Sequence, residues 1–510
     1  MRNDDINSGS FSIGWQLFDL EKQAVRILAT IRTAMNQLRP VNRLPPEIFV
    51  KVFEDCEEER DLDVATHVCA RWRAILTSTP YLWTKIDFEH AARANRYLER
   101  SKPALIDVTV GKTRDTIIGP VGTFIGATPW VARMKSLRIQ TDMEQIKKIA
   151  DRLRQETPNL RSLTFEGRAR LYSYSSIGGN GSSGAIYVPY EFLGRHAPLL
   201  ESLTFRSVSP SVVFTFPLPK LTHIDWVAET AHVVIEELLD LFESSPLLEV
   251  IKMHVLIRRT QMYRPLNQVT LKKLHKLDWA DHNGSISLIP CLVAPELRQL
   301  MIKVTHNPQH QRSTLSTILS PHHDHIPLLL EPTGVEYSYK NGNRSCRFNY
   351  QGSNAFLSIR EVTKDRNVNP TASRWFSPDL PVSFSKTREL TVEAAGGCPP
   401  LDDLPIQQFG SLRRLEFAGE TDSLVPMIKL NRGISGNVTS APCPELSEIW
   451  ITPRDHYFAL EGLEEVLGQR READYGVKTI RLLGRHKFTR IHILELRNSV
   501  DQVITERLNT

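Results

Sequence analysis

The apolar residues along the chain follow two periods, and the first of them is helical. Between residues 15 and 38, apolar or small side chains recur in alternating steps of three and four, at Leu17, Leu20, Ala24, Ile27, Ile31, Ala34 and Leu38. This spacing places them on one side of a helix, and Pro40 predicts its end. The stripe favours an amphipathic helix packed on the following domain over a short dimerising coiled coil, because three heptads without a ladder of opposite charges are few for a coiled coil.

From Val41 to His90 the helical period continues in shorter segments. Apolar residues recur at helical spacing in two groups, Ile48, Val52 and Phe53, and then Val64, Val68, Trp72, Ile75 and Leu76. Pro45 and Pro46 suit a helix entry, where a missing N–H is tolerated, and Glu47 suits the first turn. We therefore expect a small all-α domain of two or three helices over residues 41–90.

Beyond about residue 103 the period changes to that of short strands that repeat along the chain. Each unit is a proline, an aliphatic residue and an alternating strand, as in the run from Pro198 through Leu200 and Leu203 to Phe205. Further copies begin at Pro158, Pro219, Pro246, Pro295, Leu412 and Pro444. Most steps between copies are 21 to 34 residues, with helical patterns in between. One such unit cannot bury its own apolar face, so the units must stack.

These patterns predict an α+β protein, in which a small all-α domain precedes an α/β solenoid with a parallel concave sheet. The units resemble leucine-rich repeats, although the Asn or Cys that usually follows the strand is not consistently present. The predicted organisation is an amphipathic helix at residues 1–40, the helical domain at 41–90 and the solenoid at 91–510. Within the solenoid we expect a Gly/Ser insertion near 172–186 and an irregular region near 303–387.

Composition narrows the choice of partners. The 510 residues carry a formal net charge of +5. This excess of positive charge is too small for a chain of this length to imply a nucleic-acid groove. We expect no membrane partner and a cytoplasmic or nuclear location, because no stretch approaches the roughly 20 apolar residues of a membrane span and the N-terminus lacks the order of a secretory signal. No Cys pair has zinc-site spacing and no catalytic motif occurs, so we expect no metal, no cofactor and no enzymatic activity.

One segment carries a specific motif. Residues 44–48 read Leu-Pro-Pro-Glu-Ile, residues 68–72 read Val-Cys-Ala-Arg-Trp, and Leu82-Trp83 closes the segment. The order and spacing of these anchors resemble an F-box, and the whole chain is similar in outline to fungal-type F-box proteins with repeats behind the box. The resemblance implies binding of the Skp adaptor of a cullin-RING ubiquitin ligase. The implied contact residues are Leu44, Pro45, Pro46, Glu47, Ile48, Val68, Cys69, Arg71, Trp72, Leu82 and Trp83.

The repeats would then recognise a target protein. In each strand, alternation sends the residue between two buried positions to the open face of the sheet. The candidate contact residues on that face are Asp225, Lys252, Asp278, Met301, Glu416 and Trp450. Their mixed charge suits a protein target better than a phosphate backbone. The sequence thus predicts a substrate-recognition adaptor of an SCF-type ligase containing the Skp adaptor and a cullin. The alternative is a non-ligase F-box scaffold, dimeric through residues 15–38.

Overall fold

A computed structural model of the chain describes most of the sequence and divides it into two compact units, Met1–Ile139 and Gln140–Thr510. The described residues are 5–54, 59–111, 129–167, 192–208, 216–258, 267–281, 289–306, 331–340, 343–350, 355–363, 382–394, 404, 406–419, 421–429, 431–432, 438–452, 462–484 and 490–506. The Gly/Ser insertion predicted near residues 172–186 lies outside them.

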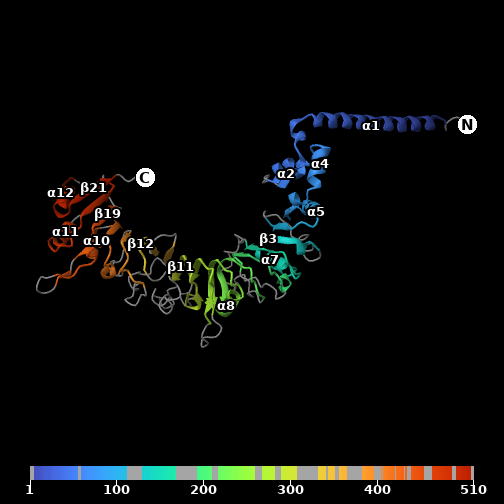
Figure 1. The fold of residues 1–510 in the computed structure, drawn as a ribbon. Helices are drawn as coiled ribbons and strands as arrows, with labels where there is room; N and C mark the ends of the chain where they lie inside the picture. Colours follow the sequence, from blue (N-terminus) through green and yellow to red (C-terminus); the bar gives the residue numbers. More distant parts are fainter. Residues whose placement is uncertain are drawn as a thin grey trace, which may run out of the picture. The chain divides into compact units, whose positions relative to one another are not determined.

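The first unit is mainly helical (Figure 1). Its α-helices are α1 (Asp5–Gln37), α2 (Pro46–Glu54), α3 (Glu59–Ala65), α4 (Ala70–Thr77) and α5 (Ala91–Arg100). Its 3-10 helices are η1 (Pro40–Arg43), η2 (Pro80–Trp83) and η3 (Pro129–Arg133). Its strands are β1 (Lys85–Asp87), β2 (Ile106–Val110) and β3 (Met134–Thr141), whose last two residues belong to the second unit. Strand β2 pairs in parallel with both β1 and β3.

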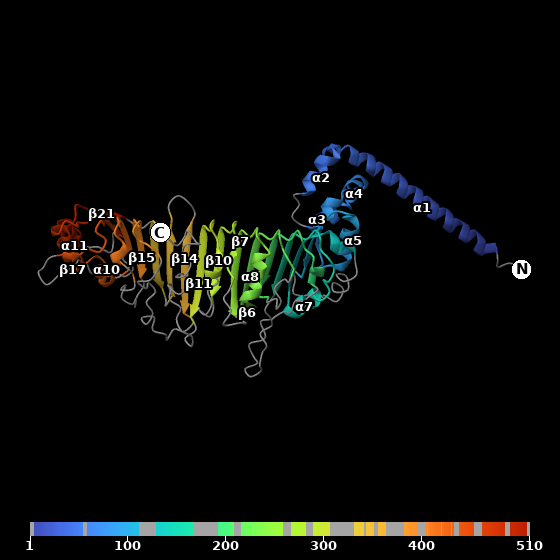
Figure 2. The ribbon, with the colours of Figure 1, turned by 60° about the horizontal axis from the view of Figure 1, so that its bottom comes forward.

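The second unit is built on parallel strands (Figure 2). Its main strands are β4 (Ser162–Gly167), β5 (Ser202–Arg206), β6 (His223–Val234), β7 (Val250–Arg258), β9 (Lys276–Asp281), β11 (Gln299–His306), β12 (Gly334–Lys340), β13 (Asn343–Asn349), β14 (Phe356–Thr363), β15 (Glu389–Ala394), β16 (Arg414–Ala418), β19 (Glu448–Thr452), β20 (Thr479–Leu483) and β21 (Gln502–Glu506). Short pairs are formed by β8 (Val269–Thr270) with β10 (Leu292–Val293), and by β17 (Asn431–Arg432) with β18 (Val438–Ser440). Its helices are α7 (Met143–Ala150), η5 (Phe192–Arg195), α8 (Ile235–Glu243), η6 (Ile289–Cys291), η11 (Ile406–Gln408), α10 (Thr421–Ile428), α11 (Leu463–Glu472) and α12 (Arg490–Ser499).

The recurring proline marks a turn that leads into each strand. The Leu221 amide donates to the Leu218 carbonyl at 3.0 Å, which places Pro219 second in the turn. The same bond joins Leu200 to Ala197 across its own proline, at 3.2 Å. Proline is favoured at this position because its fixed φ matches the turn. The aliphatic residue that closes the turn is fully buried in both copies. The repeat in the sequence is therefore a turn, a core anchor and a strand.

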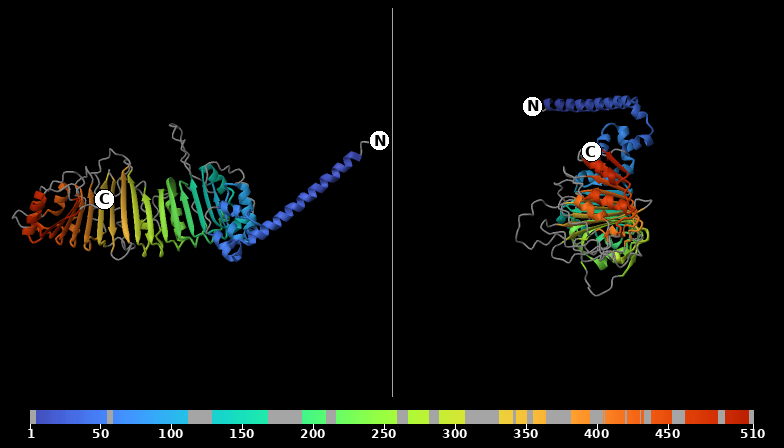
Figure 3. Two further views of the ribbon diagram at one scale, coloured as in Figure 1. Left: turned by 90° about the horizontal axis from the view of Figure 1, so that it is seen from above. Right: turned by 90° about the vertical axis from the view of Figure 1, so that its left-hand side faces the viewer.

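The strands pair in the register that the repeats predict. Leu203 of β5 lies between Leu163 and Ile224, and Ile224 lies beside Ile251. Each of these four side chains is at most 2% exposed. Figure 3 shows the strands of the second unit following one another across the sheet. A helical first region followed by a large, predominantly parallel sheet confirms the expected α+β class.

The region predicted to be irregular contains three strands that the repeat pattern does not reveal. Strand β14 follows β11 in parallel, and β13 and β12 then form antiparallel pairs before β12 joins β15 in parallel. The hairpin keeps the core register, since Val335 pairs with Phe348 and with Leu390. Strands β20 and β21 also extend the sheet beyond the last predicted copy.

Helices bury apolar residues against the sheet of the second unit. Helix α8 buries Leu238, Leu241 and Phe242, and α11 buries Leu463 and Leu467. Alternate residues of the strands stay partly exposed, as the pattern of buried and half-buried positions in β16 and β19 shows. The sheet thus has one core face and one polar, open face. No helix within the described ranges combines the length and hydropathy needed to cross a membrane.

Candidate protein-docking surfaces

The Leu44-Pro45-Pro46 segment is fixed to helix α4 through its backbone. Pro46 begins α2, and the Phe49 amide donates to the Pro45 carbonyl at 3.0 Å. The Arg71 guanidinium donates to the Leu44 carbonyl at 2.9 Å. A guanidinium that satisfies a backbone carbonyl across 27 residues of chain holds the segment in one position. Arg71 therefore positions the Leu44-Pro45 segment, while the side chain of Leu44 stays half-buried and the ring of Pro45 is exposed.

Trp72 joins α4 to α2 through an aromatic cluster. Its ring lies 4.9 Å from that of Phe49 and 5.7 Å from that of Phe53, in edge-on arrangements that aromatic pairs favour. Its indole N–H donates to Oδ1 of Asn42 at 2.6 Å. The Asn42 amide in turn donates to the Asn36 carbonyl at 2.6 Å, at the end of α1. Trp72 is half-buried, so it is part of the domain core and also reaches the surface.

Cys69 has a local structural role that its place in the motif does not reveal. Its thiol accepts a hydrogen bond from the Trp72 amide at 3.5 Å and so caps the N-terminus of α4. Capping satisfies one of the amides that the first helical turn leaves without a helical partner. The neighbouring Val68 is 54% exposed. Cys69 thus fixes where α4 starts, next to an exposed valine.

Helices α2 and α3, together with the residue before Cys69, leave large apolar side chains exposed. Ile48 is 50% exposed, close to the value for Val68. Two further valines, Val52 of α2 and Val64 of α3, are also mostly exposed. The helical spacing of these valines does not by itself show whether they face the core or a partner. Four large apolar side chains left exposed in so small a domain indicate a surface that interacts with a partner.

The structure corrects the assignment of Leu82 and Trp83 to this surface. Trp83 is fully buried, its indole N–H donates to the Leu76 carbonyl at 2.8 Å, and its ring packs edge-on against Tyr97 at 4.8 Å. Leu82 is 8% exposed. These residues fill the core beneath α4 and α5 instead of facing a partner. A tryptophan whose N–H reaches a backbone carbonyl can be buried without an unmet donor, and sequence does not show that carbonyl.

The open face of the second sheet brings the predicted target-contact residues into one row. Asp225, Lys252, Asp278 and Met301 are cross-strand neighbours on β6, β7, β9 and β11. In the later strands, Glu416 lies beside Trp450. The row also contains Ser358, Arg347 and Glu336 from the inserted strands, which sequence reasoning missed.

Several of these side chains are engaged with one another. Asp225 accepts from Arg206 at 2.8 Å and lies 3.9 Å from Lys252. His254 contacts Asp278 at 3.0 Å. Partly exposed pairs of this kind add little stability each, but together they hold the charged groups in a fixed pattern across the strands. This part of the face therefore presents an ordered array of alternating charge.

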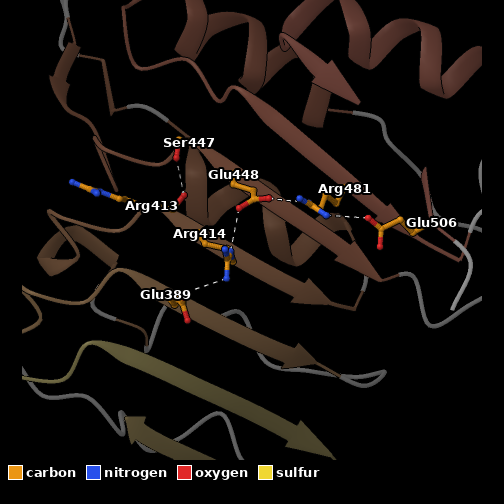
Figure 4. Close-up of polar contacts among 7 residues, drawn as sticks. All are labelled: Glu389, Arg413, Arg414, Ser447, Glu448, Arg481 and Glu506. Carbon is orange, nitrogen blue, oxygen red and sulfur yellow. Dashed lines mark hydrogen bonds and ion pairs between the residues drawn. The ribbon is translucent and has the colours of Figure 1, made fainter. Parts of the chain in front are cut away.

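A second charged array crosses the last strands of the sheet (Figure 4). The Glu448 carboxylate accepts from Arg414 at 3.1 Å and from Arg481 at 2.9 Å. The outer ends of the array are Glu389, 3.0 Å from Arg414, and Glu506, 3.0 Å from Arg481. We call these five residues the Glu-Arg ladder. They run across β15, β16, β19, β20 and β21 in alternating sign.

Trp450 lies between the two arginines of the ladder. Each guanidinium lies 5.0 Å from the indole ring, within the range of a cation–π contact. The side chain is half-buried and is held in place between the two guanidinium groups. Any target that contacts Trp450 must therefore meet the arginines beside it.

The two half-buried carboxylates near Trp450 have opposite electrostatic environments. Burial alone would raise the pKa of Glu448, but the hydrogen bonds that it accepts from Arg414 and Arg481 outweigh burial and lower that pKa. Burial raises the pKa of Glu416, Arg414 opposes the rise, and Glu336 and Glu389 add to it. The ladder thus stabilises the charge of Glu448, while the Glu416 charge is poorly compensated.

Comparison with known families identifies the first of these surfaces. Residues 41–89 match the F-box-like family model. The matched range contains the Leu44-Pro45 segment, the Trp72 cluster, and the exposed Ile48 and Val68. The search of curated proteins found no match to the chain. The residues 41–89 form an F-box-like domain, which is a protein-interaction module and in known proteins serves as a non-catalytic adaptor.

Proposed function

From the F-box-like domain at residues 41–89 we propose that this chain is the substrate-recognition subunit of an SCF-type cullin-RING ubiquitin ligase. The domain would bind the Skp adaptor, which carries the cullin, and the sheet of the second unit would bind a target protein. The single observation that supports this best is the exposure of Ile48 and Val68 in a domain whose Leu44-Pro45 segment is held by the hydrogen bond from Arg71. Preorganised apolar side chains of this kind lose little conformational entropy on binding.

The proposed mechanism requires no chemistry from this chain. A target held on the sheet would be kept near a ubiquitin-charged enzyme on the cullin, so that its lysines react at a raised effective concentration. We further propose that the repeats form a leucine-rich-repeat-like solenoid. Asp225, Lys252, Asp278, Met301, Glu416 and Trp450 would contribute to the target surface on its open face. The ordered arrays of paired charge on this face favour a target of matching alternating charge.

Recovery of ligase subunits from cells with the tagged full-length chain tests the proposal. The wild-type chain should recover both the Skp adaptor and the cullin. Changing Ile48→Glu together with Val68→Glu should remove both, because each change places a charge where an apolar contact is proposed. A matched control, Ala92→Glu, adds a carboxylate to an exposed position of α5, outside the matched residues, and should keep both partners.

The other possible results of this recovery experiment would contradict the proposal in different ways. Recovery of the adaptor without a cullin would contradict a ligase role and favour the alternative of a non-ligase scaffold. Recovery of neither by the wild-type chain would contradict adaptor docking altogether. Loss of both partners by the Ala92→Glu control would place the docking surface elsewhere in the first unit.

A further inference from the structure

Helix α1 carries a wide face without a single charged residue. Leu17, Leu20, Ile27 and Ile31 lie on this face, and each of them is at least half exposed. Other members of the face, at helical spacing between residues 16 and 35, are Gln16, Ala24, Leu28, Ala34 and Met35. At 100° per residue they span a sector of about 120°, the width of a face that normally packs against another element. We call this sector the apolar face of α1.

The following domain does not cover the apolar face in the described part of the chain. The contact that ties α1 to the domain is made at its end, where the Asn42 amide donates to the Asn36 carbonyl. Residues 14–34 are exposed throughout. The structure thus contradicts the prediction that this helix packs on the domain after it. Because isolated helices gain little stability without packing of their apolar side, a helix of 33 residues with such a face requires a partner.

The sizes of the side chains select a second copy of the same helix in antiparallel orientation. In a parallel pair each residue meets itself, so that Ala24 would face Ala24 and Ala34 would face Ala34, which leaves two gaps in the core. In an antiparallel pair with Leu17 opposite Ala34, the other layers become Leu20 opposite Ile31 and Ala24 opposite Ile27. Every alanine then meets a large side chain, the alternation that close packing requires.

The charges of the helix agree with the same orientation. Outside the apolar face, the acidic residues Asp19 and Glu21 lie earlier along the helix than the basic residues Arg26 and Arg32, with Lys22 between them. An antiparallel pair brings the acidic half of one helix beside the basic half of the other, and it opposes the two helix dipoles favourably. In that register Glu21 is about two residues from the level of Arg32 of the second copy, and both residues border the same edge of the apolar face. A parallel pair would place like charges together.

We propose that this protein forms a homodimer through an antiparallel pair of α1 helices, with Leu17 of one copy beside Ala34 of the other. Pairing would bring two F-box-like domains into one assembly. The proposal is independent of the proposed ligase role, because α1 lies before the residues that match the F-box-like family.

Sedimentation equilibrium of the purified full-length chain tests the dimer. The wild-type protein should show twice the mass of the 58.1 kDa chain. The double variant Ile27→Glu, Ile31→Glu should raise the dissociation constant of the dimer at least a hundred-fold, since it places two carboxylates in the apolar contact between the paired helices. The matched control Ala29→Glu, Thr33→Glu adds the same charges at the same spacing on the opposite side of the helix and should remain dimeric. Retention of the Skp adaptor by all three proteins, or an unchanged circular dichroism spectrum, shows that folding is intact.

Disulfide trapping tests the orientation. Leu17→Cys and Ala34→Cys chains, mixed and oxidised, should give a disulfide between residues 17 and 34, identified by mass spectrometry of the joined peptides. Neither variant alone should join to itself, because the antiparallel pair holds equivalent positions roughly 25 Å apart at 1.5 Å of rise per residue. A monomeric wild-type chain at about 50 µM, an unchanged dimer in the Ile27→Glu, Ile31→Glu variant, or a 17-to-17 disulfide would each overturn the proposal.

Discussion

At the scale of single residues, the environment of a side chain decides its role more than its identity does. Arg71 and Trp72 are adjacent, yet Arg71 holds a backbone carbonyl and Trp72 fills an aromatic cluster. The motif identified both positions but not this division. The same holds for Glu416 and Glu448, which lie on neighbouring strands. Their surroundings raise the pKa of Glu416 and lower the pKa of Glu448. Cross-strand partners of this kind come from distant parts of the chain, so a single segment of sequence cannot show them.

The two glutamates give opposite expectations for stability. The pKa of Glu448 is lower in the folded protein than the value of about 4.3 in the unfolded chain. Its ionised carboxylate therefore stabilises the fold above about pH 4.3, and this stabilisation is lost as the pH falls through the folded-state pKa. Glu448→Gln should therefore destabilise the protein by about 1 to 2 kcal/mol at pH 7 and by progressively less in acid. A raised pKa, as for Glu416, lowers stability as pH rises above the unfolded pKa. Glu416→Gln should then be neutral or slightly stabilising at pH 7.

Thermal unfolding of both variants between pH 4 and pH 7 measures this difference. A loss of stability in Glu416→Gln equal to that in Glu448→Gln at pH 7 would contradict the assignment of Glu448 as the central acceptor of the Glu-Arg ladder. Both changes keep the size of the side chain, so each serves as the steric control for the other.

At the scale of elements, the sequence predicts what is local and repeated. The turn-anchor-strand units, the helices after the Leu44-Pro45 segment and the register of the early strands all follow from the spacing of apolar residues within or between successive units. The inserted β12–β13 hairpin and strands β20 and β21 do not, because they lack the proline-to-strand spacing of the repeated unit and are recognisable only by the strands they join. The docking residues divide in the same way, since Ile48 and Leu82 look equally apolar in the sequence but only Ile48 is exposed.

One buried arginine joins several elements that no repeat connects. The side chain of Arg470 in α11 is fully buried, and it donates to the carbonyls of Ile428, Pro442, Cys443 and Tyr475 at 2.8 to 3.2 Å. Burial lowers its pKa, but the guanidinium stays charged because no arginine loses its proton in the ordinary pH range. These contacts fasten α11 to the end of α10 and to the turn before β19.

Arg470→Ala should destabilise the second unit by about 3 kcal/mol or more, because it leaves several buried carbonyls without a donor. The adjacent Arg471→Ala is the control, since Arg471 is partly exposed and pairs with Asp501 at 3.8 Å. This change should lower the free energy of unfolding by about 1 kcal/mol or less. Calorimetric unfolding of the full chain measures both. Equal effects of the two variants would contradict the role of Arg470 as a clamp between elements.

At the scale of the whole molecule, the chain combines two kinds of surface with different demands. The F-box-like domain presents a few exposed apolar residues on a rigid support, which suits one constant partner. The sheet presents a broad array of paired charges, which suits selection among targets by electrostatic match. Sequence identified the first surface through its motif, whereas the pairing of charges on the second depends on neighbours that only the folded sheet brings together.

The affinity of purified Skp adaptor for the full-length chain, measured by isothermal titration calorimetry, tests the central claim most directly. The double variant Leu44→Ala, Pro45→Ala removes side chains that are partly exposed and leaves the Leu44 carbonyl available to Arg71. We predict adaptor binding at least ten-fold weaker than in the wild-type chain, with unfolding of the second unit unchanged. Equal affinity in the two proteins would contradict docking of the adaptor on the Leu44-Pro45 segment.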